Sequence, residues 1–116
     1  MSQVIDVKDA LERVQDDKEL LLELFDIFTE DFTAKRDAFW KAMQERNATA
    51  FGQLAHGLKG ATGNISAAQM HENCVKLDTM GKDRDLTNAK AALELLDKQF
   101  EEFKAEAARL KIEFSK

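Results

Sequence analysis

Phe51-Gly-Gln-Leu-Ala-His-Gly-Leu-Lys-Gly-Ala-Thr-Gly63 holds four of the five glycines in the chain, and they surround His56. The stretch keeps a helical apolar period, although a glycine inside a helix costs about 1 kcal/mol relative to alanine. Repeating that cost on one face suggests that the face has to stay uncovered. We therefore expect a helix here, with room for something bulky to approach His56.

A helical wheel separates the two faces of this segment, because an α-helix turns about 100° per residue. His56 points almost directly away from the apolar stripe, and Lys59 follows one turn later on the same side. The stripe itself is the predicted core face, and it consists of Phe51, Leu54, Ala55, Leu58, Ala61, Thr62 and Ile65.

Composition limits the class of protein. The chain has 116 residues, no proline and a net charge of −5, which predicts one largely helical domain spanning 1–116. The negative net charge argues against a protein that binds nucleic acid. No apolar run suits a membrane span, and no secretory signal is visible at the N-terminus. Cys74 is a lone cysteine, so we expect no internal disulfide and a cytoplasmic protein.

Acidic residues are distributed unevenly. The chain contains 22 of them, yet none falls between Arg46 and His71. We interpret this gap as a surface around His56 that is kept clear of negative charge. A site that meets an anion would have this property.

Capping residues predict the first three helices. Asp6 is the expected N-cap of a short helix over about 7–14. Asp16 and Glu19 form a capping box for a long second helix that runs to about 46. Asn47 is the expected N-cap of the third helix, which carries His56 and ends near position 64.

Two further helices follow. Ser66 with Gln69 predicts a capping box at the start of the fourth, and Gly81 suits its C-terminal cap. Asp85 is the expected cap of the last helix. Its apolar positions alternate steps of three and four, as in bundles; they are Leu86, Ala89, Leu93, Leu96, Phe100, Phe103, Ala107, Leu110 and Phe114.

The long second helix has its own stripe, made of Leu21, Leu24, Phe25, Phe28, Phe32, Phe39 and Met43. Short polar links between the helices make neighbours antiparallel. The predicted fold class is therefore all-α, an antiparallel up-and-down four-helix bundle with a short extra N-terminal helix.

Phosphoryl transfer is the chemistry that the segment favours. An exposed neutral imidazole is nucleophilic at pH 7. A nearby ammonium, here that of Lys59, stabilises the charge on a transferring phosphoryl group. Gly60, four residues after His56, leaves the ring uncrowded.

The segment His56-Gly-Leu-Lys59-Gly60-Ala-Thr-Gly63-Asn-Ile-Ser-Ala67 resembles the signature of histidine phosphotransfer (HPt) domains, H-x-L-K-G followed by small residues. The resemblance extends to chain length, helical core and position of the motif. It implies that His56 is the phosphoacceptor, that Lys59 stabilises charge and that Gly60 gives clearance. Ser66 departs from the glycine of many members, and we expect a slightly different turn there.

The resemblance also implies the partners. His56 would take a phosphoryl group from the aspartyl phosphate of a receiver domain, in a response regulator or a hybrid sensor histidine kinase, and pass it to another receiver. We expect a monomeric phosphocarrier without ATP-dependent kinase activity, because no phosphate-binding loop is visible. No metal site is expected here, no cofactor is needed, and Mg²⁺ would belong to the receiver.

Receiver docking is predicted over the His56 face. The expected contacts are Gln53, Gly57, Gly63 and Asn64, together with Leu20 and Ile27, which lie off the buried stripe of the second helix. The last two could instead pack against the first helix.

Two alternatives use the same helices differently. A di-iron bundle needs Glu-x-x-His motifs, but the residues three before His56 and His71 are Gln53 and Ala68. A non-catalytic helical adaptor is the other alternative, and the long apolar repeat of the last helix is compatible with it. Transfer of label from a phosphorylated receiver separates an adaptor from a phosphocarrier.

Overall fold

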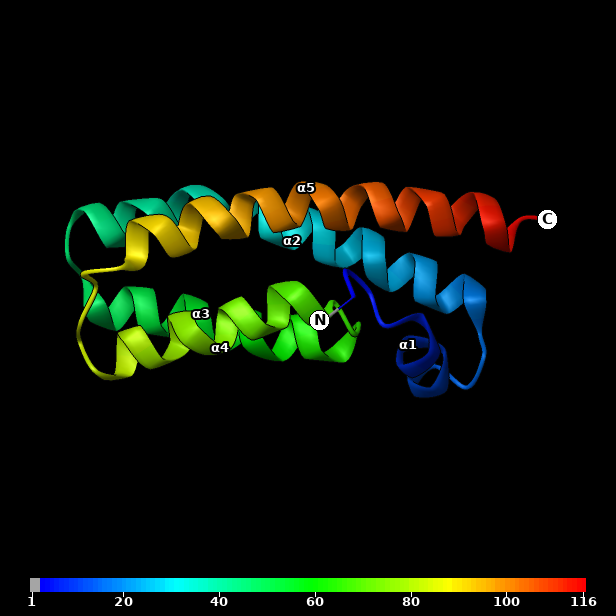
Figure 1. The fold of residues 1–116 in the computed structure, drawn as a ribbon, viewed down its shortest axis with the longest axis horizontal. Helices are drawn as coiled ribbons and strands as arrows, with labels where there is room; N and C mark the ends of the chain where they lie inside the picture. Colours follow the sequence, from blue (N-terminus) through cyan, green and yellow to red (C-terminus); the bar gives the residue numbers. More distant parts are fainter. Residues whose placement is uncertain (1–2) are drawn as a thin grey trace.

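The structure is a computed structural model that describes residues 3–116. Those residues form five helices: α1 (Val7–Arg13), α2 (Lys18–Gln44), α3 (Ala48–Asn64), α4 (Ala68–Lys82) and α5 (Ala89–Phe114). The last four run up and down as a bundle, and α1 lies across one end of it (Figure 1). The predicted fold class is confirmed.

The bundle consists of two unequal pairs of helices. α2 and α5 are long and lie side by side, whereas α3 and α4 form a shorter hairpin against part of their length (Figure 1). α1 occupies the space that the shorter hairpin leaves beside the first turns of α2. The α3–α4 hairpin therefore has one side that is not covered by α2 or α5, and His56 of α3 lies on that side.

Aromatic rings fill the space between α2 and α5. Phe25 and Phe28 of α2 meet Phe103 of α5 edge to face, with ring centroids 5.5 and 5.2 Å apart, a geometry that aromatic quadrupoles favour. The predicted stripes of both helices are buried, except that Leu24, Met43, Leu86, Ala107 and Phe114 are half-buried. Periodicity thus located the core correctly.

Two of the predicted caps are confirmed. Asp6 Oδ1 accepts a hydrogen bond from the Asp9 amide at 3.1 Å, and Asn47 Oδ1 accepts one from the Ala50 amide at 3.0 Å. At the start of α2 the predicted cap was wrong by one residue. Asp16 has φ 63°, and Asp17 instead caps the helix by accepting from the Leu20 amide at 3.0 Å.

The predicted boundaries around α4 and α5 were also wrong. Gly81 lies inside α4, and Arg84 takes the left-handed φ of 54° after the helix ends. Asp85 does not cap α5, because its carboxylate accepts from the amide and hydroxyl of Thr87 in a turn that precedes the helix. α5 accordingly begins at Ala89.

Ser66 occupies the turn between α3 and α4 with a φ of 57°. A residue with this φ cannot be an N-cap, so the predicted capping box was wrong and Ala67 takes the cap position. The Ser66 hydroxyl instead donates to Asp9 Oδ2 at 2.6 Å, and this bond lowers the pKa of the Asp9 carboxyl. Ser66 thus has a backbone conformation that usually favours glycine, and its side chain links this turn to α1.

Two further observations concern the whole fold. Within residues 3–116, no helix has the length and apolar character that crossing a membrane requires. Cys74 is fully buried, and burial raises the pKa of its thiol to about 12. Cys74 therefore packs in the core as a small apolar residue.

Candidate functional site

His56 stands on the outer face of α3. The opposite face of the helix is buried through Phe51, Ala55, Leu58 and Thr62, so the imidazole is turned to solvent and its side chain is 71% exposed. The predicted orientation of His56 is therefore confirmed. Its role in transfer stays a prediction.

The glycines around His56 divide into two groups. A Cβ on Gly57 or Gly60 would meet nothing within 4 Å, so both positions face open space, and Gly60 shares the helix face of His56. Gly52 and Gly63 instead face α4, where Gly52 lies against Gly81 and Gly63 against the ring of His71. The expectation that all four glycines clear a solvent face is thus correct for two of them, and the other two allow close packing.

A carboxylate that sequence reasoning missed lies beside His56. Asp78 of α4 has a side chain only 5% exposed, and its Oδ1 lies 3.7 Å from His56 Nδ1. Its Oδ2 accepts from Lys59 Nζ at 2.7 Å and lies 3.0 Å from Lys82 Nζ. The predicted acid-free surface around His56 was therefore wrong, because the gap in the sequence is closed by a residue from the neighbouring helix.

The Asp78 cluster, meaning Asp78 with Lys59 and Lys82, is nevertheless positive overall. The hydrogen bond from Lys59 is the main cause that lowers the pKa of the Asp78 carboxyl, and Lys82 adds to it against the opposing effect of burial. One carboxylate facing two ammonium groups leaves one positive charge in excess. A cluster of this sign attracts an anion, which preserves the predicted character of the site.

Lys59 is bound to a residue of the neighbouring helix. Its side chain is 29% exposed and its ammonium is held by Asp78, whereas the Lys82 side chain is 65% exposed. One signal for Asp78 was available in the sequence. It sits beside Cys74 and Gly81 on the apolar stripe of α4, and a carboxylate in such a place needs a cationic partner.

His71 joins α4 to the backbone of α3. Its Nδ1 lies 2.9 Å from the carbonyl oxygen of Lys59, which can only accept, so Nδ1 carries the proton. The Thr62 hydroxyl is 3.2 Å from the same nitrogen. His71 therefore has a helix-packing role, and the contact holds the turn of α3 that carries Lys59.

The predicted docking residues differ in exposure. Gln53, Gly57 and Asn64 are exposed on α3, and Gly63 is half-buried. Leu20 and Ile27 are both exposed on α2, Ile27 by 61%. Their predicted exposure is confirmed, while their contact with a partner stays a prediction.

The distance of Leu20 and Ile27 from the site follows from helix geometry. Phe39 of α2 packs on Phe51 of α3, and the two helices are antiparallel. At 1.5 Å per residue, Ile27 lies about 11 Å farther along the bundle than His56, and Leu20 about 21 Å farther. Ile27 is therefore the better placed of the two for a partner that covers His56.

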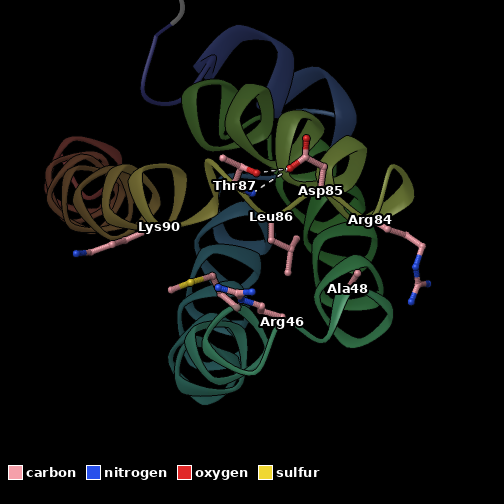
Figure 2. A pocket seen from close by; sticks show the side chains of 8 residues that line it. Arg46, Ala48, Arg84, Asp85, Leu86, Thr87 and Lys90 are labelled. Atoms are coloured by element: carbon pink, nitrogen blue, oxygen red, sulfur yellow. Dashed lines mark hydrogen bonds between the residues drawn. The ribbon is translucent and has the colours of Figure 1, made fainter.

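A basic hollow of about 570 Å³ lies elsewhere, where the α2–α3 turn meets the α4–α5 loop. Arg46, Arg84 and Lys90 line it, but Figure 2 shows Arg84 and Lys90 pointing away from each other. Asp85 is turned toward Thr87. Because these cations do not converge and His56 is not in the lining, the hollow is not the site.

Metal ligands are not gathered in the part of the chain that the structure describes. Among residues 3–116, no group of three or more His, Cys, Asp or Glu side chains is arranged to hold a metal ion. The contacts at His56 bring together an imidazole, a carboxylate and two ammonium groups.

Removing the Asp78 charge should lower stability in a pH-dependent way. We expect Asp78→Asn to reduce the free energy of unfolding by about 1–3 kcal/mol at pH 7, because Lys59 loses a largely buried partner. Since the folded-state pKa of Asp78 is lowered, its stabilisation is present above the unfolded value of about 3.9. It is lost as the pH falls through the lower folded value.

Urea unfolding at a series of pH values between about 2 and 7 checks this prediction. The difference between wild type and Asp78→Asn should shrink toward the acid end. Asp83→Asn is the matched control, because Asp83 is an exposed neighbour outside the cluster. A difference that stays constant across the pH range would contradict the ion-pair account.

Comparison with known proteins adds two findings. A sequence profile described as the Hpt domain matches residues 23–109, a range that includes His56, Lys59 and Asp78. The fold is similar to the crystal structure of histidine-containing phosphotransfer protein B (HptB) from Pseudomonas aeruginosa PAO1, with a TM-score of 0.81 and 23% identity over 94% of this chain and 98% of that one. No curated protein sequence matches significantly.

Proposed function

This chain belongs to the Hpt domain family, and from that premise we propose that it is a phosphorelay intermediate that carries its phosphoryl group on His56. The donor is the aspartyl phosphate of one receiver domain and the acceptor is the aspartate of another. The observation that carries the proposal is the exposed imidazole of His56 next to the buried carboxylate of Asp78, which holds Lys59 and Lys82.

The position of Asp78 favours one ring nitrogen of His56 as the nucleophile. Nδ1 lies 3.7 Å from Asp78 Oδ1, longer than a hydrogen bond. A small movement of the ring would allow Nδ1–H to donate, and such bonds commonly tighten when a reaction complex forms. With the proton on Nδ1, the lone pair is on Nε2.

The proposed transfer is a displacement at phosphorus. The Nε2 lone pair attacks phosphorus, the N–P bond forms, and the P–O bond to the receiver aspartate breaks, with its electron pair leaving on the carboxylate. The imidazole of His56 then carries both the phosphoryl group and the Nδ1 proton, and the adjacent Asp78 carboxylate stabilises the resulting positive charge. The return step to a second receiver is the reverse.

Lys59 and Lys82 supply positive charge for the transferring group. Both ammonium groups contact Asp78 Oδ2, so the carboxylate holds them near the ring while one unit of positive charge remains in excess. Stabilisation of the equatorial oxygens by such preorganised cations is the main catalytic contribution expected in phosphoryl transfer.

The remaining apparatus is proposed to belong to the receiver. The receiver would bring the activated acyl phosphate and its Mg²⁺ and cover the face that bears Gln53, Gly57 and Asn64, whereas Gly63 packs against His71 of α4. Ile27 offers an exposed apolar contact on α2, and exposed apolar side chains are typical of such surfaces. Phosphorylation from ATP by the chain itself is not part of the proposal.

A direct transfer assay tests this function. A receiver domain is phosphorylated with a labelled small acyl phosphate and Mg²⁺, freed of donor, and mixed with the purified chain. We expect label to pass to the chain and then to a second receiver. A receiver that binds the chain without passing any label would favour the helical adaptor instead.

Substituting Gly60 should separate clearance from helix stability. Gly60→Leu fills open space beside the ring and should slow transfer at least tenfold, because small misplacements of reacting groups cost that much or more. The same change should stabilise the helix by up to about 1 kcal/mol. Gly60→Ala, with a Cβ that meets nothing, should lose much less activity; full activity of Gly60→Leu would contradict the clearance role.

A further inference from the structure

Two glycines, Gly52 of α3 and Gly81 of α4, bring the backbones of these helices into close contact. A Cβ built on Gly81 would clash with the Cα of Gly52 and stand 3.0 Å from the Gly52 backbone nitrogen. Neither glycine has a positive φ. Both are therefore explained by the room that they leave and not by backbone conformation.

This crossing lies one helical turn from the site on each helix. On α3, Gly52 precedes His56 by four residues; on α4, Asp78 precedes Gly81 by three. Residues at these spacings share a helix face. The separation of the two backbones at the glycines therefore sets the separation of the His56 ring from the Asp78 carboxylate.

We propose that the Gly52–Gly81 crossing is a positioning device that holds Asp78, and with it Lys59 and Lys82, in register with His56. The effect on transfer rests on the proposed function, whereas the effect on the Asp78 cluster does not. Gly81 itself is buried, so it acts through the placement of the charged groups and touches no partner.

The two glycines are not equivalent, so their alanine variants should differ in effect. A Cβ on Gly52 would stand 3.4 Å from the Gly81 Cα, at the edge of ordinary contact. A Cβ on Gly81 has to force the helices apart. Both substitutions replace a helical glycine by alanine, which by itself favours the helix, so a loss confined to Gly81→Ala is due to the crossing distance.

The test compares Gly81→Ala with Gly52→Ala. Gly81→Ala should slow phosphoryl transfer to the chain by about ten- to a hundredfold, the loss typical of a displacement near 1 Å, while Gly52→Ala should lose no more than about threefold. Leu110→Ala serves as a stability control, because Leu110 is buried in the distant part of α5 and its loss should not affect transfer.

A second readout needs no transfer at all. Carbon-13 NMR of the Asp78 carboxyl should show its titration midpoint rising toward the ordinary aspartate value in Gly81→Ala, because the contact with Lys59 weakens, and staying low in Gly52→Ala. If both variants kept the wild-type midpoint, the positioning role would be refuted whatever the kinetics.

The two readouts keep the proposals apart. If the wild-type chain took no label but the Asp78 midpoint rose in Gly81→Ala, the positioning role would stand and the phosphorelay function would fail. If the wild type took label and Gly81→Ala were equally fast, the positioning role would fail and the function would stand.

Discussion

Replacing His56 by glutamine should abolish phosphoryl transfer to this chain while leaving the fold intact. The glutamine amide has no nucleophilic lone pair comparable to that of imidazole. Because the His56 side chain is 71% exposed, its replacement should change the free energy of unfolding by no more than about 0.5 kcal/mol. Label on the protein after incubation with a phosphorylated receiver, together with thermal unfolding, measures both effects.

The second histidine provides the control for this experiment. His71→Gln should still take label, because His71 is engaged with the Lys59 carbonyl in helix packing, and a glutamine amide can donate to the same oxygen. If His56→Gln kept its label and His71→Gln lost it, the phosphoryl group would be on His71, and the role proposed for His56 would be wrong.

Lys59→Ala should slow transfer by one to a few orders of magnitude, the second-largest effect we expect. The substitution removes an ammonium that Asp78 holds near the ring, and the loss of one preorganised electrostatic contact costs about 10²–10³ in rate. It also leaves Asp78 with Lys82 as its remaining cation. Single-turnover transfer rates measured against the same phosphorylated receiver check the prediction.

Lys111→Ala is the matched control for Lys59→Ala. Lys111 is an exposed lysine in the last turn of α5, so its removal changes net charge equally without touching the site. It should leave the rate close to that of the wild type. If the wild type, Lys59→Ala and Lys111→Ala had equal transfer rates, Lys59 would have a structural contact with Asp78 but no role in transfer.

Local sequence pattern was sufficient for the helices and the core. The stripes of α2, α3 and α5 could be read from spacing, because burial of one helix face repeats every three or four residues whatever lies opposite. The exposure of His56 followed from the same wheel. Asp6 and Asn47 could be identified as caps because capping is a contact within one turn of the chain.

The ends of α2 and α3 were predicted to within two residues, but no glycine marks the end of α2, α3 or α4, since this chain fills its left-handed positions with ordinary residues. Arg46, Ser66 and Arg84 take positive φ there, and no glycine does. Each is stabilised by backbone bonds to the helix that it ends, as when the Arg84 amide donates to the Gly81 carbonyl at 3.2 Å. Gly81 was wrongly predicted to be a cap, because a glycine is needed there for close packing against Gly52 of α3 and not for the end of α4.

The candidate site was half visible in the sequence. His56, Lys59 and Gly60 lie on one segment and could be read together. Asp78 and Lys82 reach the site only because α4 packs antiparallel on α3 in a particular register. That register depends on close contacts at Gly52 and Gly63, and no local pattern encodes a distance between two helices.

Identifying the phosphorylated atom tests the central claim most directly. Phosphorus–proton correlation NMR of the chain, recorded after transfer from a phosphorylated receiver, reports which nitrogen of which histidine bears the group. We predict a single phosphoryl group on Nε2 of His56, with the proton kept on Nδ1 beside Asp78. A phosphoryl group on His71, on an oxygen of any other side chain, or on no residue at all would contradict this account.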